Sequence, residues 1–168
     1  MNRVAAIAGS AIFLVIAPGT VAVLIPRRIY HWQMAPPLLG FVPFRVLGVL
    51  LICAGLPVLL DSFARFAVVG LGTPAPVAPP KHLVVSGLYR HVRNPMYVAV
   101  LSLVLGQGLL FGSVRVLEYG AALFVIVHLF VLLYEEPALQ RKFGSKYDDY
   151  RKNVKRWWPR VRGWIGDS

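Results

Sequence analysis

Long apolar stretches separated by short polar ones dominate this chain. About 20 consecutive apolar residues are needed to cross the hydrocarbon core of a bilayer. Four stretches approach or reach that length, at residues 4–25, 41–60, 97–116 and 117–134. A tight turn at residues 112–115 lies near the junction of the last two, which predicts an antiparallel helical hairpin. The pattern therefore predicts an all-α integral membrane bundle of four transmembrane helices, forming a single domain over residues 1–168.

A secretory signal peptide is the alternative interpretation of the first apolar stretch, which follows Arg3. Its apolar length exceeds that of a typical signal core, and no clear cleavage site of small residues leads into a soluble domain. We therefore expect a retained membrane helix.

The charged residues change this picture only in part. They make up 15% of the chain against 57% apolar residues, and the formal net charge is +11. Soluble domains carry about 25% charged residues. Nine of the eighteen lysines and arginines follow Glu136, which favours contact with anionic membrane lipids over binding of nucleic acid. A single cysteine, Cys53, excludes an intramolecular disulfide.

The distribution of basic residues also predicts an orientation. With a cytoplasmic N-terminus, fourteen of the eighteen basic residues lie on the inside and four on the outside. This agrees with the positive-inside rule, although Arg27 and Arg28 are discordant. Four prolines at residues 70–80 predict an extended cytoplasmic linker between the second and third spans.

The chain after Pro137 predicts a charged amphipathic helix. Its apolar residues recur at spacings of three and four, which places them on one face: Leu139, Phe143, Tyr147, Tyr150 and Val154. Such a helix lies in the membrane interface or folds over the bundle. Trp157, Trp158 and Trp164 then resemble interfacial anchors.

Candidate chemistry begins just before the third span. Asn94-Pro95 is typical of a helix start, with asparagine as the N-cap and proline at the first helical position. Arg90 and Arg93 immediately precede it, so a helix N-terminus and two guanidinium groups form a candidate anion site. A positively charged flank of a capped membrane helix is the alternative interpretation.

Two adjacent carboxylates, Glu135 and Glu136, end the fourth span. A helix C-terminus is unfavourable for negative charge. The hairpin places this end beside Arg90 and Arg93, so the sequence predicts either a structural salt bridge or a site for a zwitterionic or cationic ligand. His128 shares their helix face, and we expect a hydrogen-bonded packing role for it rather than catalysis. Gly106 and Gly108 are expected to allow close helix packing, and no metal-ligand cluster is apparent.

These residues carry a resemblance to the isoprenylcysteine carboxyl methyltransferase and phospholipid methyltransferase-like membrane family. It covers residues 81–160, the predicted cofactor-binding half. The first part of the family pattern is matched by Leu83, Val84, Gly87, Tyr89, Arg93, Pro95 and Tyr97. The second part is matched by Glu135, Glu136, Leu139, Phe143, Gly144, Tyr147, Tyr150 and Pro159.

The resemblance implies S-adenosylmethionine as methyl donor and a lipophilic or lipid acceptor. It implies catalytic roles for Arg93, Glu135 and Glu136. The residues that it implies for cofactor binding are His82, Leu83, Val84, Gly87, Tyr89, Arg90, Asn94, Pro95, Tyr97, Glu135 and Glu136. Asn94 stands where the family has histidine, and its amide cannot carry a proton as a general base.

Several functions remain open at this point. The first is methylation of the carboxylate of a prenylcysteine-like or other lipid-like molecule by a multi-pass protein whose active site faces the cytoplasm. The alternatives are a phospholipid N-methyltransferase, an NADPH-dependent membrane reductase of the sterol reductase type, and a non-enzymatic four-span protein. The sequence leaves the oligomeric state open.

Overall fold

The computed structural model describes residues 3–70 and 81–165, and these residues form helices and loops without a strand. The helices and single helical turns are α1 (Arg3–Gly19), η1 (Thr20–Leu24), α2 (Ile25–Tyr30), η2 (Leu38–Gly40), α3 (Pro43–Val68), η3 (Gly87–Arg90), α4 (Pro95–Phe111), α5 (Val114–Phe130), η4 (Val131–Glu135), α6 (Glu136–Phe143) and α7 (Ser145–Asn153). The predicted linker lies almost entirely outside the described residues.

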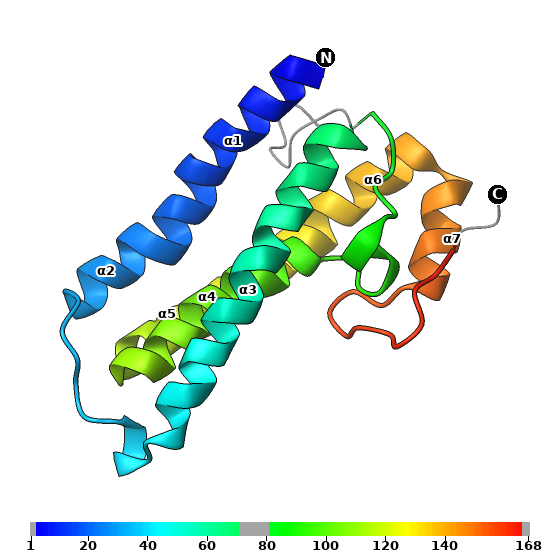
Figure 1. Cartoon of the computed structure of the whole chain (residues 1–168). Helices are drawn as coiled ribbons and strands as arrows, with labels where there is room; N and C mark the ends of the chain where they lie inside the picture. The colour runs from blue at the N-terminus through cyan, green and yellow to red at the C-terminus, as the bar shows by residue number, and fades with distance from the viewer. Residues whose placement is uncertain (1–2, 71–80, 166–168) are drawn as a thin grey trace.

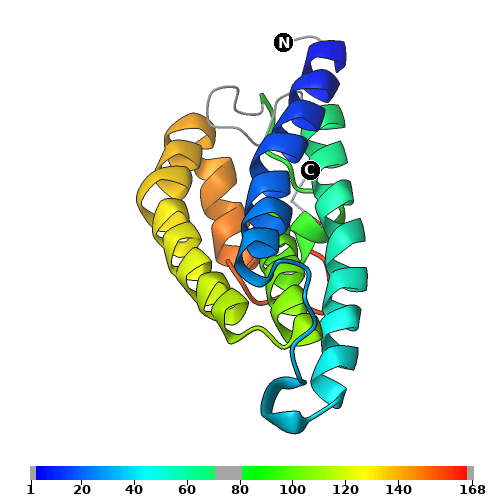
Figure 2. The same cartoon turned by 90° about the vertical axis from the view of Figure 1, so that its left-hand side faces the viewer.

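Three continuous helices are long and apolar enough to cross a membrane: Val4–Tyr30, Pro43–Val68 and Val114–Phe143. The fourth, α4, is apolar but has 17 residues, about 26 Å at 1.5 Å per residue. The all-helical prediction is confirmed, and three to four of these helices can span a bilayer. The elongated helices run alongside one another, with α1 against α3 (Figures 1 and 2).

Several boundaries differ from the predicted spans. The first helix continues to Tyr30 and the last one runs over Val114–Phe143. The second, α3, continues to Val68, about two turns beyond residue 60, and carries there an i,i+4 ion pair of 2.7 Å between Asp61 and Arg65. The third ends at Phe111, where Gly112 adopts a left-handed φ of 69°. The Ser113 side chain then accepts a hydrogen bond from the Val116 N–H and caps α5. The hairpin and its predicted turn within residues 112–115 are confirmed, although the third helix ends before residue 116, where the predicted span ended.

Small residues bring α3 and α4 into close contact. A Cβ atom added to Gly48 would lie 2.6 Å from the Gly106 carbonyl oxygen, and one added to Gly108 would lie 2.5 Å from the Leu117 side chain. Both distances are shorter than real Cβ contacts. Gly106 and Gly108 therefore serve close helix packing, as predicted, on the α3 and α5 sides respectively.

The first membrane helix passes through a π turn, η1, that ends just before Pro26. Proline has no N–H to donate to the carbonyls of the preceding turn. Side chains from the hairpin supply donors in place of the missing N–H. The Tyr119 hydroxyl donates to the Val21 carbonyl at 2.9 Å, and Gln107 Nε2 donates to the Ala22 carbonyl at 2.7 Å. These hydrogen bonds attach the first helix to α4 and α5.

The predicted single C-terminal amphipathic helix is instead two short helices, α6 and α7. They meet at Gly144, whose φ of 53° interrupts the helical path. The apolar face predicted from spacing packs inward: Tyr147, Tyr150 and Val154 are buried and contact Leu83 and Val85. Figure 1 shows α7 beside the loop that precedes α4.

The predicted interfacial tryptophans also differ from one another. Trp157 and Trp164 make contacts within the protein, and Trp158 is 75% exposed. The tail that carries them turns back along the protein after α7 (Figure 1).

Candidate functional site

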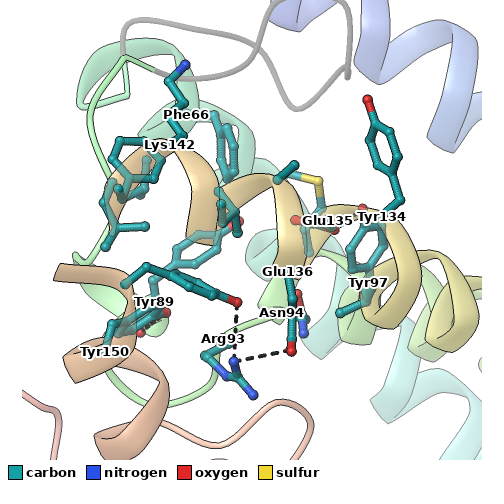
Figure 3. Close-up of a pocket in the computed structure, with 18 of the residues that line it drawn as sticks. Phe66, Tyr89, Arg93, Asn94, Tyr97, Tyr134, Glu135, Glu136, Lys142 and Tyr150 are labelled. Atoms are coloured by element: carbon teal, nitrogen blue, oxygen red, sulfur yellow. Dashed lines mark hydrogen bonds and ion pairs between the residues drawn. The ribbon is translucent and has the colours of Figure 1, made fainter. Parts of the chain in front are cut away.

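A cavity of about 220 Å³ lies where the start of α4 meets η4, α6 and α7. Figure 3 shows its polar side chains converging from these elements. The residues that line it are Phe66, Leu83, Val84, Tyr89, Arg93, Asn94, Met96, Tyr97, Phe130, Val131, Tyr134, Glu135, Glu136, Ala138, Leu139, Lys142, Phe143, Tyr147 and Tyr150. Most of the lining is apolar or aromatic, with a small set of charged groups, which is typical of ligand pockets.

One wall is the loop and η3 turn that precede α4. Gly87 begins this turn at a φ of 54°, and a Cβ there would overlap the Arg65 guanidinium, so the close approach to α3 requires glycine. The Tyr150 hydroxyl donates to the Tyr89 carbonyl at 2.6 Å and fixes this turn against α7. Burial raises the pKa of Tyr89 and Tyr150, and it raises the pKa of Tyr147 to about 12. These hydroxyls are therefore neutral at physiological pH.

Asn94 occupies the N-cap position of α4, but its side chain makes no capping hydrogen bond. The predicted side-chain cap is therefore wrong. Asn94 Nδ2 donates instead to the backbone carbonyl of Arg156 at 3.3 Å. The returning tail therefore supplies an acceptor for the Asn94 amide N–H, and no local sequence pattern indicates it.

The second π turn, η4, places Glu135 and Glu136 in different surroundings. Glu135 accepts a hydrogen bond of 2.8 Å from the Tyr97 hydroxyl. Glu136 faces Arg93, with 3.1 Å between Arg93 Nη1 and Glu136 Oε1. Their side chains are 8% and 10% exposed, so this ion pair is nearly buried. The predicted meeting of the two carboxylates with two arginines holds for Glu136 and Arg93, whereas Arg90 is exposed and lies outside the cavity lining.

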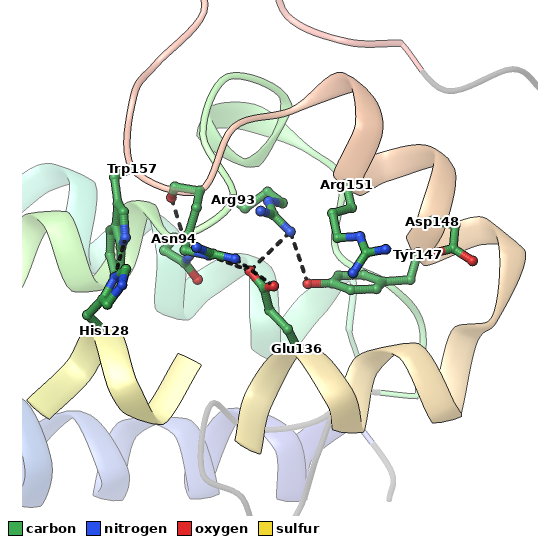
Figure 4. A network of polar contacts seen from close by, with 9 residues as sticks. Arg93, Asn94, His128, Glu136, Tyr147, Asp148, Arg151 and Trp157 are labelled. Carbon is green, nitrogen blue, oxygen red and sulfur yellow. Dashed lines mark hydrogen bonds and ion pairs between the residues drawn. The ribbon is translucent and has the colours of Figure 1, made fainter. Parts of the chain in front are cut away.

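Figure 4 shows Arg93, Glu136 and Tyr147 in one polar network. Arg156 also belongs to this network. Its Nε and Nη2 donate to the two oxygens of Glu136 at 2.6 and 2.9 Å. These hydrogen bonds raise the pKa of Arg156. Arg93 also donates to the Tyr147 hydroxyl at 3.3 Å, while its buried Nε finds no hydrogen-bond partner among the described residues. Glu136 is thus neutralised by two guanidinium groups.

Glu135, unlike Glu136, is not neutralised by a guanidinium group of the described residues. Within residues 3–70 and 81–165, no lysine or arginine forms an ion pair with it. The salt-bridge interpretation therefore describes Glu136, and Glu135 is the cavity carboxylate whose charge has no cationic partner.

The structure brings together most of the sequence-predicted site residues. Those at the cavity are Leu83, Val84, Tyr89, Arg93, Asn94, Tyr97, Glu135 and Glu136. The other four lie outside its lining: His82 and Arg90 are exposed, Gly87 packs on Arg65, and Pro95 is buried at the first turn of α4.

The C-terminal strap, residues 154–164, was not predicted to take part in the site. It bonds to the segment before α4 through three backbone contacts. The Arg93 N–H donates to the Lys155 carbonyl, the Arg160 N–H to the His91 carbonyl, and the Trp164 N–H to the Arg90 carbonyl, at 2.9 to 3.0 Å. His91 Nδ1 also donates to the Arg160 carbonyl at 2.8 Å.

Sequence reasoning missed Arg156, which lies in a run of basic residues that resembles a solvated tail. The strap also explains His128, because Trp157 Nε1 donates to His128 Nδ1 at 3.0 Å. The hydrogen-bonded packing role predicted for His128 is confirmed. Among the described residues, no three His, Cys, Asp or Glu side chains form a metal-binding group.

The sequence model described as phospholipid methyltransferase matches residues 44–146, more than half of the chain. This protein belongs to the phospholipid methyltransferase family. The family also contains the membrane methyltransferases that resemble isoprenylcysteine carboxyl methyltransferase. The match includes α4, α5, η4 and α6, and the strap lies beyond it. Searches of curated proteins and of solved structures returned no match.

Proposed function

We propose that this protein is an S-adenosylmethionine-dependent methyltransferase that methylates the carboxylate of a lipophilic acceptor, a prenylcysteine-like or other lipid-like molecule. Family membership supports methyl transfer at a membrane. The observation that carries the assignment to this cavity is the inequality of two adjacent carboxylates. Glu136 is neutralised by Arg93 and Arg156, whereas Glu135 has only the Tyr97 hydroxyl.

The residues at the cavity fit the methyl donor. A carboxylate without a cationic partner suits a ligand that carries a sulfonium and an ammonium group, and we assign this role to Glu135. Arg93 Nε is buried and has no partner among the described residues, so it suits the donor's carboxylate. Tyr89 and Phe143 offer aromatic surface nearby.

The donor supplies a methyl group already activated by the sulfonium, so the protein contributes mainly positioning. Arg93 would hold the carboxylate of the donor and Glu135 its cationic groups, and together they would orient it. Glu136 would hold the Arg93 side chain in position through the ion pair of 3.1 Å. The lining residues Phe66, Met96 and Phe130 provide apolar surface for the acceptor's hydrocarbon part. We expect this end of the bundle to face the cytoplasm and the acceptor to enter from the bilayer.

A carboxylate acceptor agrees with the scarcity of bases at the cavity. Among the described residues that line it, none is histidine, and the Asn94 amide is engaged by the strap. A carboxylate is already ionised at neutral pH and needs no base. An ammonium acceptor must first lose a proton.

A phospholipid amine is the second candidate, favoured by the family description. In that case Glu135 would be the carboxylate able to accept the proton. Incubation of the purified protein with methyl-labelled donor and a lipid extract separates the two. A methyl ester releases its label as volatile methanol in alkali, and an N-methyl group does not. We expect alkali-labile label; alkali-stable label in a lipid headgroup would favour the amine acceptor.

The reductase and non-enzymatic alternatives predict different binding. Calorimetry on purified protein should detect the donor or its demethylated product, S-adenosylhomocysteine. Binding of NADPH without any response to either compound would contradict the methyltransferase proposal. Absence of binding by all three would favour the non-enzymatic protein.

A further inference from the structure

Arg156 does not line the cavity, but it forms hydrogen bonds with residues that do. Its side chain is 26% exposed and holds both oxygens of the nearly buried Glu136. Its backbone carbonyl accepts from Asn94 Nδ2, and the carbonyl of the preceding residue accepts from the Arg93 N–H. Arg156 is therefore bonded to two cavity residues, Glu136 and Asn94, and the neighbouring Lys155 carbonyl is bonded to a third, Arg93.

The two hydrogen bonds from Arg156 to Glu136 limit how Arg93 can contact the same carboxylate. Because Arg156 occupies both carboxylate oxygens, Arg93 reaches Glu136 through Nη1 alone. Arginine and carboxylate groups favour the two-bond fork when both oxygens are accessible. Without Arg156, Arg93 would be free to form two hydrogen bonds to Glu136, and its Nε would then point away from the cavity.

We propose that Arg156 is a positioning residue for the donor site: it holds Glu136 so that Arg93 presents an unpaired N–H to the ligand. This inference rests on the proposed function. It extends the site to the strap, which lies outside the matched family region.

Charge alone predicts the opposite effect of removing Arg156. The four side chains Arg93, Arg156, Glu135 and Glu136 carry no net charge together. Arg156→Gln leaves an excess negative charge, which would strengthen binding of the cationic donor relative to its uncharged-sulfur product. Positioning through Arg93 instead predicts weaker binding of both compounds, because both carry the same carboxylate.

The test is calorimetric titration of the full-length protein in detergent with S-adenosylmethionine and, separately, S-adenosylhomocysteine. We expect Arg156→Gln to weaken both affinities about tenfold, within the range of coupling seen between contacting polar residues. Lys155→Gln is the matched control, since it removes a neighbouring exposed charge and keeps the backbone contact to Arg93. Its affinities should stay within about twofold of wild type.

A double-mutant cycle shows whether the effect passes through Glu136. In a Glu136→Gln background, Arg156→Gln should weaken binding by less than about twofold further. An undiminished tenfold effect in that background overturns the inference, as does wild-type affinity in Arg156→Gln or tighter binding of the donor alone. Failure of the wild-type protein to bind either compound overturns the proposed function as well.

Arg156→Lys covers the case in which Arg156→Gln does not fold. Lysine keeps the charge but cannot form the fork. We expect an unchanged thermal midpoint and about a threefold loss of affinity for both compounds. Full affinity in this variant contradicts the positioning role.

Discussion

The two π turns of this protein are built alike and have different roles. Each is five residues long, follows a long apolar helix, and ends two residues before a proline, Pro26 after η1 and Pro137 after η4. At η1, carbonyls of the turn receive hydrogen bonds from Gln107 and Tyr119. The second turn, η4, ends at Glu135, α6 begins at Glu136, and both carboxylates line a cavity.

A π turn in the backbone does not by itself define a functional site. A π turn widens the helix locally and is often found at functional positions. At η1 the surrounding helices close the turn with side-chain donors, so it acts as a joint between helices. At η4 and the start of α6, Glu136 is paired with two guanidinium groups, whereas Glu135 has only the Tyr97 hydroxyl. The two π turns therefore differ in the side chains around them rather than in their backbone.

The largest effect should come from Glu135→Gln. The change keeps the side-chain shape and an oxygen acceptor for Tyr97, but removes the negative charge that we assign to the donor. We expect methyl transfer to fall about 100-fold, as for loss of a charged partner in a desolvated site. The thermal midpoint in detergent should stay near that of wild type. Turnover within a few-fold of wild type would contradict the assignment.

Glu136→Gln, at the first residue of α6, should lower the stability of the protein, which Glu135→Gln should not. It leaves Arg93 buried beside Arg156 without a compensating charge, and breaking a buried ion pair costs about 3 kcal/mol. We therefore expect a marked loss of stability, measured as a lower thermal midpoint, together with weaker donor binding. A stable variant with normal affinity would show that the two carboxylates do not differ in the way described.

Gln107→Leu tests the structural turn. It leaves the Ala22 carbonyl without its Nε2 donor in an apolar environment, at a cost of about 1–2 kcal/mol. Donor affinity should remain at the wild-type value, because Gln107 does not line the cavity. A change in affinity without a change in stability would mean that η1 is coupled to the site.

Tyr119→Phe should have the smallest effect. Interhelical hydrogen bonds within membrane proteins average about 0.6 kcal/mol, so the loss of the bond to the Val21 carbonyl should lower the thermal midpoint only slightly. Methyl transfer should not change. Combining this variant with Gln107→Leu should give a nearly additive loss unless the two donors act as a unit.

The local features of the fold could be predicted from the sequence. Apolar length predicted the membrane helices, and Gly112 with Ser113 predicted the hairpin turn. The adjacency of Arg93 and the carboxylates followed from that hairpin. The helix ends were harder to predict, since α3 continues to Val68, beyond the predicted span that ends at residue 60.

The long-range part of the site could not be predicted. Asn94 and Arg156 are separated by 62 residues along the chain, and Arg156 and Glu136 by 20. The Asn94 amide donates to a distant carbonyl, and only the path of the strap brings that carbonyl within reach. Likewise, the apolar spacing of Tyr147 and Tyr150 indicates a buried face but not the segment that covers it.

The central claim, that this cavity binds the methyl donor, is tested most directly by photoaffinity labelling. The purified protein is irradiated with labelled S-adenosylmethionine, and the labelled peptides are mapped. We expect label at aromatic residues that line the cavity, such as Tyr89, Tyr97 or Phe143, and suppression by excess S-adenosylhomocysteine. Suppressible label confined to α1 and α2, or no suppressible label, would contradict the claim.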